Sequence, residues 1–344
     1  MNRLTLRHDI PDAFLDISYR DIKKVFDTPT LVHLKGEKNP ALFVSVLLHG
    51  NEYSGLIIMQ EILKKYKETQ GYALPRSMWM FVGNVEAASK GLRRLDDELD
   101  FNRAWPGTSE PDAPTSKLIS EVMEKITEDG LFAAIDLHNN TGKNPPYGCI
   151  SVVNEKNKYL SSFFNHIAMV FHTPKGVSTM AFDTICPAIT LECSTPGNQL
   201  GIEKAVALID DLMHMDHFPE RPLPSHDLQL VKNSAVLKIA DNVHFGFEGE
   251  EGNFDLTLVD HFDRHNFTRL ETSEVFAHTT LDKPIVATLE DGTDVTDALI
   301  RNVNGAISLK KPLMPAMITL DKRIIVQDCL CYLLEDYFEK NKVI

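Results

Sequence analysis

Apolar and polar positions alternate in two ways along the first two thirds of the chain. Short apolar runs rich in β-branched and aromatic residues predict strands, and segments with apolar residues every three or four positions predict helices. The expected strands are 41–48, 77–84, 131–137 and 187–193, and the expected helices are 53–69, 115–129 and 201–215. Alternating strands and helices are typical of an α/β layer architecture.

One long stretch, 85–114, interrupts this pattern. It is polar and carries Pro106, Gly107, Pro111 and Pro114. The composition predicts a long loop, and loops of this length in compact domains are usually functional. We therefore expect substrate contacts there.

The pattern changes after Phe218. The segment 219–227 is polar and rich in proline, which predicts a linker, and the segments beyond it are short, β-like and separated by turn signals. The length of 344 residues also favours two domains. We expect a catalytic domain over 1–222 and a smaller β-rich domain over 223–344.

Composition and charge exclude several functional classes. Hydrophobic residues make up 43% of the chain, which is typical of soluble globular proteins, and the longest apolar run, 41–48, is much shorter than the roughly 20 residues of a membrane-spanning helix. The net charge of −14 opposes binding to nucleic acid and to anionic membranes. The N-terminal residues lack the apolar stretch of a secretory signal. The five scattered cysteines lack a CxxC pair, so we expect a cytoplasmic protein without a thiolate zinc site.

Candidate metal ligands follow two of the predicted strands. The strand 41–48 runs directly into His49 and Glu52, and the strand 131–137 runs into His138. An HxxE pair alone often occurs on a surface by chance. Two histidines and a carboxylate at the ends of sheet strands, however, match a catalytic zinc site with three protein ligands and an open position. Asp136 either orients a ligand histidine or is an ordinary strand-end carboxylate.

Basic residues stand out in the predicted loop. Arg93, Arg94 and Arg103 suit an anionic substrate, because a guanidinium binds a carboxylate in bidentate fashion, although pairing with the nearby acidic residues 96–100 is an alternative. Glu192 ends an otherwise apolar strand and is the candidate general base and acid; a structural ion pair is the alternative. His214 and His217 close a predicted helix, where histidine commonly interacts with the helix dipole, so we expect no metal there.

Several separated motifs, in this order, resemble the succinylglutamate desuccinylase and aspartoacylase family of the zinc carboxypeptidase-like superfamily. They are HGNE (49–52), NVEA (84–87), GLRRLD (91–96), DFNRAWPG (100–107), DLHNNTG (136–142) and TLEC (190–193). The resemblance implies a mixed sheet flanked by helices, with a smaller C-terminal β-rich domain.

The same resemblance implies roles for individual residues. His49, Glu52 and His138 would hold Zn²⁺, Arg93 would polarise the scissile carbonyl, and Glu192 would activate water. Asn102 and Arg103 would hold the substrate carboxylate. Compared with the family's pattern, two extra residues lie between Arg93 and the DFNR segment, so the resemblance does not separate Arg93 from Arg94, and Arg94 is a candidate substrate contact.

We therefore expect a zinc-dependent amidohydrolase or metallocarboxypeptidase that cleaves an amide bond next to a free carboxylate, in a peptide or an N-acyl amino acid. The DLHNNTG segment favours the peptidase-like members slightly. The alternatives are an N-acyl amino acid deacylase of the desuccinylase or aspartoacylase type, and a non-catalytic relative that only binds a ligand. A homo-oligomer is compatible with the sequence.

Overall fold

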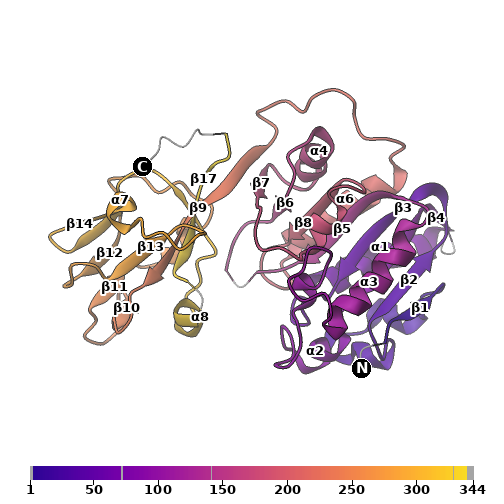
Figure 1. The fold of residues 1–344 in the computed structure, drawn as a ribbon, viewed down its shortest axis with the longest axis horizontal. Helices are drawn as coiled ribbons and strands as arrows, with labels where there is room; N and C mark the ends of the chain where they lie inside the picture. Colours follow the sequence, from indigo (N-terminus) through magenta and orange to yellow (C-terminus); the bar gives the residue numbers. More distant parts are fainter. Residues whose placement is uncertain (1–2, 71–72, 141, 328, 339–344) are drawn as a thin grey trace. The chain divides into compact units, whose positions relative to one another are not determined.

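A computed structural model describes residues 3–70, 73–140, 142–327 and 329–338. The chain divides into two compact units (Figure 1). The first contains Met1–Asn139 and Pro146–Gln229, and the second contains Asn140–Pro145 and Leu230–Ile344. The first unit ends at Gln229, and the second continues from Leu230. The domain boundary expected after residue 222 stays a prediction.

The first unit is built on a mixed sheet with the strand order β1-β2-β4-β3-β5-β8-β6-β7. At its centre, β3 pairs in parallel with β4 and β5, and β5 pairs in parallel with β8. Toward the two edges, β2 and β6 run antiparallel to their inner neighbours β4 and β8. The strands are β1 (Thr5–Arg7), β2 (Thr30–Leu34), β3 (Gly36–Val46), β4 (Leu74–Val82), β5 (Leu131–His138), β6 (Tyr147–Ile150), β7 (Ile167–Val170) and β8 (Ala188–Glu192).

Helices flank this sheet (Figure 1). They are the 3-10 helices η1 (Asp12–Asp16), η2 (Tyr19–Lys24) and η3 (Phe101–Arg103), and the α-helices α1 (Ser54–Gln70), α2 (Val85–Lys90), α3 (Pro114–Thr127), α4 (Glu155–Phe164), α5 (Ser178–Phe182) and α6 (Gln199–His214). The apolar face of α3 packs into a core that includes Phe43 and Trp105, which are both fully buried. The predicted mixed α/β sheet flanked by helices is confirmed.

The seven predicted strands and helices of the first unit are present, with ends shifted by a few residues. The strand expected at 41–48 is β3, which begins at Gly36 and ends at Val46, because Leu47 turns into the left-handed region with φ of 55°. The prediction of one long loop over 85–114 is wrong at its start. Asn84 accepts a hydrogen bond from Ala87 N and begins α2, and Gly91, in the left-handed conformation, ends it.

The second unit is mostly β-structure, as expected. Strands β13 and β17 both pair with β9, β16 pairs with β17, and a separate sheet has the order β10-β11-β12-β15-β14. Its strands are β9 (Gln229–Ile239), β10 (Phe245–Phe247), β11 (Leu256–Leu258), β12 (Val275–Thr279), β13 (Ile285–Thr288), β14 (Ile300–Val303), β15 (Ala306–Leu309), β16 (Met314–Ala316) and β17 (Cys331–Asp336). Its short helices are η4 (Phe262–His265), α7 (Thr296–Leu299) and α8 (Lys322–Gln327).

The segment Asn140–Pro145 belongs to the second unit although it follows β5. The side-chain oxygen of Asn144 accepts a hydrogen bond from Met317 N, and Lys143 lies 3.2 Å from Asp263. None of the helices in the described ranges has the length and apolar character needed to cross a membrane.

Candidate metal centre

The candidate site lies at the carboxyl ends of the adjacent parallel strands β3, β5 and β8. Leu47 follows β3 with φ of 55°, and Ser194 follows β8 with φ of 65°. The left-handed region is costly for residues with a side chain, so the surrounding structure must hold both turns in place. In the register of β5 and β8, His138 lies opposite Glu192. The sheet therefore brings the predicted ligand strand and the predicted base strand side by side.

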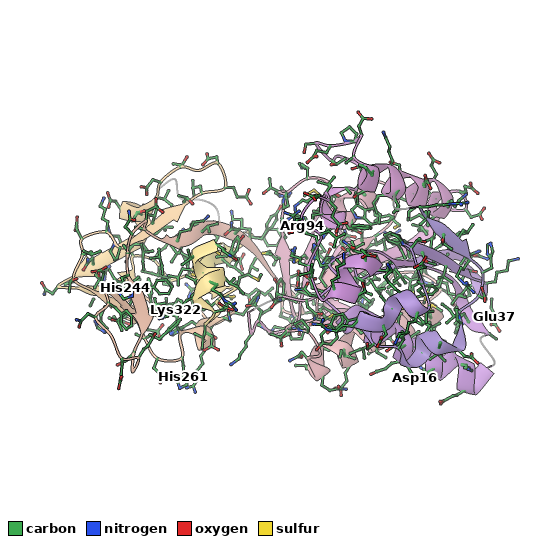
Figure 2. The ribbon with its side chains drawn as sticks, turned by 90° about the horizontal axis from the view of Figure 1, so that it is seen from below. Asp16, Glu37, Arg94, His244, His261 and Lys322 are labelled. Atoms are coloured by element: carbon green, nitrogen blue, oxygen red, sulfur yellow. The ribbon has the colours of Figure 1, made fainter. Side chains whose placement is uncertain are left out.

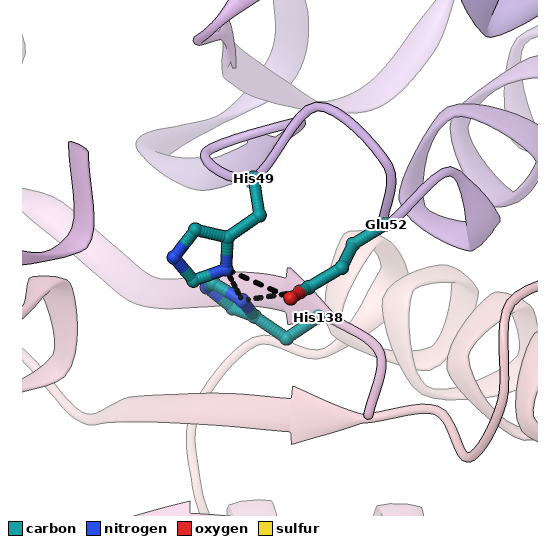
Figure 3. Close-up of side chains that lie close together, drawn as sticks. All are labelled: His49, Glu52 and His138. Carbon is teal, nitrogen blue, oxygen red and sulfur yellow. Dashed lines mark hydrogen bonds and ion pairs between the residues drawn. The ribbon is translucent and has the colours of Figure 1, made fainter. Parts of the chain in front are cut away.

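His49, Glu52 and His138 converge on one point (Figure 3). The two Nδ1 atoms of the histidines are 3.1 Å apart. Glu52 places Oε1 2.9 Å from His49 Nδ1 and Oε2 2.8 Å from His138 Nδ1. The three residues are 3%, 5% and 3% exposed.

These distances fit a bound metal ion. A tetrahedral zinc site with bonds of about 2.0–2.1 Å separates its ligand atoms by roughly 3.3 Å, close to the spacing of the nitrogens and oxygens here. The predicted ligand residues therefore form a group that can bind a metal ion.

The outer ring nitrogen of each histidine, Nε2, contacts the carboxylate of an aspartate. Asp100 Oδ1 lies 2.9 Å from His49 Nε2, and Asp136 Oδ2 lies 2.8 Å from His138 Nε2. Ser45 donates its hydroxyl to the other oxygen of Asp136. If Nε2–H donates to these carboxylates, Nδ1 keeps its lone pair for a metal ion, which is the usual arrangement around ligand histidines.

Of the two interpretations of Asp136, this geometry favours the one in which it orients His138. Asp100 was not predicted as a partner of a ligand histidine. Its only local signal is its place at the start of the DFNR segment, where it also accepts a hydrogen bond from Asn102 N.

The charges of the cluster are strongly coupled. Burial by itself would lower the pKa of His49 and His138, but Glu52 raises both, with Asp100 acting on His49 and Asp136 on His138. Burial would raise the pKa of Glu52, yet the two histidines hold it well below its usual value. Buried charges are stable only when they are paired or bind a metal ion, so a cation suits this group of side chains.

Arg93 and Arg94 differ in position. Arg93 donates from Nη1 to Glu52 Oε1 at 2.6 Å, and its carbonyl accepts a hydrogen bond from Gly50 N. Arg94, labelled in Figure 2, donates to the carbonyls of Leu95 and Glu98. The structure thus brings Arg93 to the metal ligands, while a substrate contact from Arg94 stays a prediction.

The three remaining predicted residues are Asn102, Arg103 and Glu192. Asn102 Nδ2 is 3.3 Å from His138 Nε2, and its side-chain oxygen accepts a hydrogen bond from Ser178 N. Arg103 donates to the carbonyl of Asn102. Glu192 is half-buried at the end of β8. Their roles in binding and catalysis stay predictions.

Sequence reasoning also missed Asn139. Its backbone N–H donates to Glu52 Oε2, and its side-chain oxygen accepts a hydrogen bond from Ser54 N. Its amide nitrogen donates to Ser194 O. Asn139 therefore joins the loops after β3, β5 and β8, and its only sequence signal is its place directly after His138.

Comparison with known proteins agrees with this geometry. The model of the succinylglutamate desuccinylase/aspartoacylase catalytic domain matches residues 38–194, the range that contains the three candidate ligands. Residues 38–194 therefore resemble this catalytic domain. The family is part of the zinc carboxypeptidase-like superfamily. No curated protein sequence matches the chain significantly.

Several solved structures have a similar fold. The succinylglutamate desuccinylase from Chromobacterium violaceum has 15% identity and a TM-score of 0.54, with 86% of this chain and 84% of that chain covered. Murine aminoacylase 3 has 17% identity and a TM-score of 0.53, with 87% and 96% covered. A succinylglutamate desuccinylase/aspartoacylase from Rhodobacter sphaeroides has 13% identity and a TM-score of 0.57, with 89% of each chain covered. These similarities show a shared fold.

Proposed function

We propose that the protein is a zinc-dependent amidohydrolase that removes the acyl group from an N-acyl amino acid, cleaving an amide bond next to a free carboxylate. The observation that carries this proposal is the buried convergence of His49 Nδ1, His138 Nδ1 and Glu52, with both outer histidine nitrogens held by aspartates. This group lies within the segment that matches the deacylase family.

Zinc is the metal that best suits two imidazole nitrogens and one carboxylate in a tetrahedral arrangement with one open position. Bound there, it would lower the pKa of water and polarise the substrate carbonyl. Asp100 and Asp136 would hold the two histidine rings in the orientation that points Nδ1 at the metal.

The remaining residues supply proton transfer and charge stabilisation. Arg93, whose side chain is 50% exposed while it contacts Glu52, would donate to the carbonyl oxygen as negative charge develops on it. Glu192 would take a proton from the attacking water and return it to the departing nitrogen. Arg103, together with Asn102, would bind the free carboxylate of the amino acid.

A deacylase is favoured over the carboxypeptidase that the sequence slightly favoured. The matching family model and the neighbours of similar fold are desuccinylases, aspartoacylases and an aminoacylase. A non-catalytic relative is disfavoured, because the three ligands and Glu192 are all retained.

A hydrolysis screen tests the proposal. Zinc-loaded protein is incubated with N-acetyl, N-succinyl and longer N-acyl amino acids, and in parallel with C-terminal dipeptides, and the free amine released is measured. We expect zinc-dependent release from at least one N-acyl amino acid and its loss after chelation. Hydrolysis of dipeptides alone would support the carboxypeptidase instead, and a zinc-loaded protein that hydrolyses neither class would contradict the proposal.

A further inference from the structure

An N-terminal segment that lies outside the family match contacts the site. We call η1 and η2, residues 12–24, the N-terminal strap; the family match begins only at residue 38. The strap is firmly packed, because Phe14 and Ile22 are fully buried. Gln60 of α1 donates to the carbonyls of Phe14 and Ile17. Asp16, labelled in Figure 2, ends η1 and pairs with Lys64 of α1.

Tyr19 of the strap stacks on the residue that follows a candidate metal ligand. Its ring lies 4.7 Å from that of Tyr53, with an angle of 10° between the planes. Tyr53 directly follows Glu52 and donates its hydroxyl to Pro196 O, in the loop after Glu192. The stack therefore joins the strap to the loop of a ligand and, through Tyr53, to the loop of the proposed base.

Arg20 contacts a second loop of the site. Its guanidinium lies so close to Gly91 that a Cβ built there would be 2.5 Å from Nη2. Gly91 ends α2 with φ of 67°, and Arg93, which donates to Glu52, follows two residues later. In the same helix of the strap, Lys23 forms an ion pair with Glu86 of α2.

Helix α2 also supports the ligand loop. A Cβ at Gly50 would be 2.2 Å from Ala88 N, so the loop between His49 and Glu52 packs directly on α2. The strap thus contacts α2, which directly precedes the loop of Arg93. It also contacts Tyr53, the residue that follows Glu52 in the chain. These contacts limit the positions that the two loops can adopt.

We propose that Tyr19 and Arg20 are positioning residues of the metal centre. Tyr19 holds Glu52 in ligand geometry through Tyr53, and Arg20 holds Arg93 against Glu52 through Gly91. Ligand residues that are fixed by their surroundings bind a metal ion more tightly than mobile ones, because less freedom is lost on binding. The part of this inference that concerns turnover rests on the proposed function, whereas the part that concerns metal binding does not.

The test for Tyr19 uses the full chain and measures metal binding. Tyr19→Ala, Tyr19→Phe and Lys24→Ala are compared with the parent by zinc competition against a chromophoric chelator and by the visible spectrum of the cobalt-substituted protein. Tyr19→Phe keeps the aromatic stack. Lys24 lies in the same helix, but its side chain is 74% exposed and pairs with Asp21. We expect Tyr19→Ala to weaken zinc binding by roughly 10-fold and to alter the cobalt spectrum, and the other two variants to match the parent.

Circular dichroism and thermal unfolding establish that each variant is folded at the assay temperature. If Tyr19→Ala does not fold, Tyr19→Leu, which keeps apolar volume without the ring stack, takes its place. Parental zinc affinity and cobalt spectrum in the folded variant would overturn the inference, because a strap that only stabilises the fold would lower the melting temperature without changing the metal site. An equal loss in Tyr19→Phe would also overturn it.

Arg20→Ala tests the second contact through kinetics. With a substrate found in the hydrolysis screen, we expect kcat to fall by about 10-fold with KM nearly unchanged, because Arg93 acts on the charge that develops in the transition state. Parental kcat would overturn the role of Arg20. If no substrate is hydrolysed, the proposed function fails, while the zinc and cobalt measurements on the Tyr19 variants still decide the inference for metal binding.

Discussion

The two units of the chain bury different kinds of side chain. At the ends of β3 and β5, the first unit buries ionisable residues in direct contact with one another: His49, Glu52, Asp136 and His138 are each at most 5% exposed. The core of the second unit consists of aliphatic and aromatic residues such as Leu258, Ile307 and Leu309. Among the described residues of that unit, Asp263 is the buried carboxylate, and it pairs with exposed Lys143.

This difference separates stability from chemistry. Burial of apolar surface stabilises a fold, whereas a buried charge costs several kcal/mol unless it is paired or binds a metal ion. The second unit follows the first rule throughout its core. The first unit departs from it at the carboxyl ends of β3 and β5, where ionisable side chains gather, and departures of this kind are expected at functional sites.

Removing one candidate ligand should abolish tight metal binding. His138→Ala leaves one histidine and one carboxylate, so we expect zinc affinity to fall by more than the roughly 10- to 100-fold that loss of an outer hydrogen-bond partner costs. Zinc content after dialysis and competition with a chelator measure this. His217→Ala, at an exposed histidine, is the control and should match the parent. A His138→Ala protein that keeps parental affinity would place the metal elsewhere.

Neutralising the proposed base should separate binding from chemistry. Glu192→Gln keeps the shape of the side chain at the end of β8 but removes its capacity to accept a proton. We expect turnover to fall by a factor on the order of 10² to 10⁴ with zinc affinity retained. Steady-state kinetics and metal titration on the same preparation provide both values, and retention of most of the turnover would exclude Glu192 as the base.

A cavity in the apolar core of the second unit should lower the stability of the fold and leave metal binding unchanged. Leu309 is fully buried, so Leu309→Ala should lower the free energy of unfolding by about 2–5 kcal/mol. Chemical denaturation followed by circular dichroism measures this loss. We expect zinc affinity at 25 °C to stay at the parental value. A large loss of zinc affinity in the folded variant would show that the two units are not independent in this respect.

Changing an aspartate that contacts a ligand histidine should weaken metal binding without lowering the stability of the fold. Asp100→Asn keeps the size of the residue that contacts His49 Nε2 but removes its charge. We expect zinc affinity to fall by about 10- to 100-fold, with little change in the melting temperature of the metal-free protein. Asp112→Asn, at an exposed aspartate in a surface ion pair, is the matched control. Equal affinities for the two variants would argue against an orienting role for Asp100.

The elements with strong periodicity, and the residues that directly follow them, could be predicted from the sequence. Strands β3, β4, β5 and β8 and helices α1, α3 and α6 were all predicted, because each buries a continuous apolar run or face. The grouping of His49, Glu52 and His138 could also be predicted, since the carboxyl ends of parallel strands meet at one edge of a sheet. The strands β6 and β7 and the helix α4 were not predicted. Each of the two strands has only 4 residues, and so short an apolar run does not distinguish a strand from a helix.

Local sequence patterns did not predict which distant side chains reach the site. The contacts of Asp100 with His49, of Arg93 rather than Arg94 with Glu52, and of Tyr19 with Tyr53 all join residues that are distant in the sequence. Local patterns fix the direction of a strand or a helix, but the path of a loop depends on the surfaces against which it packs. Each of these contacts rests on such packing, as when Gly50 lets the ligand loop lie directly on α2.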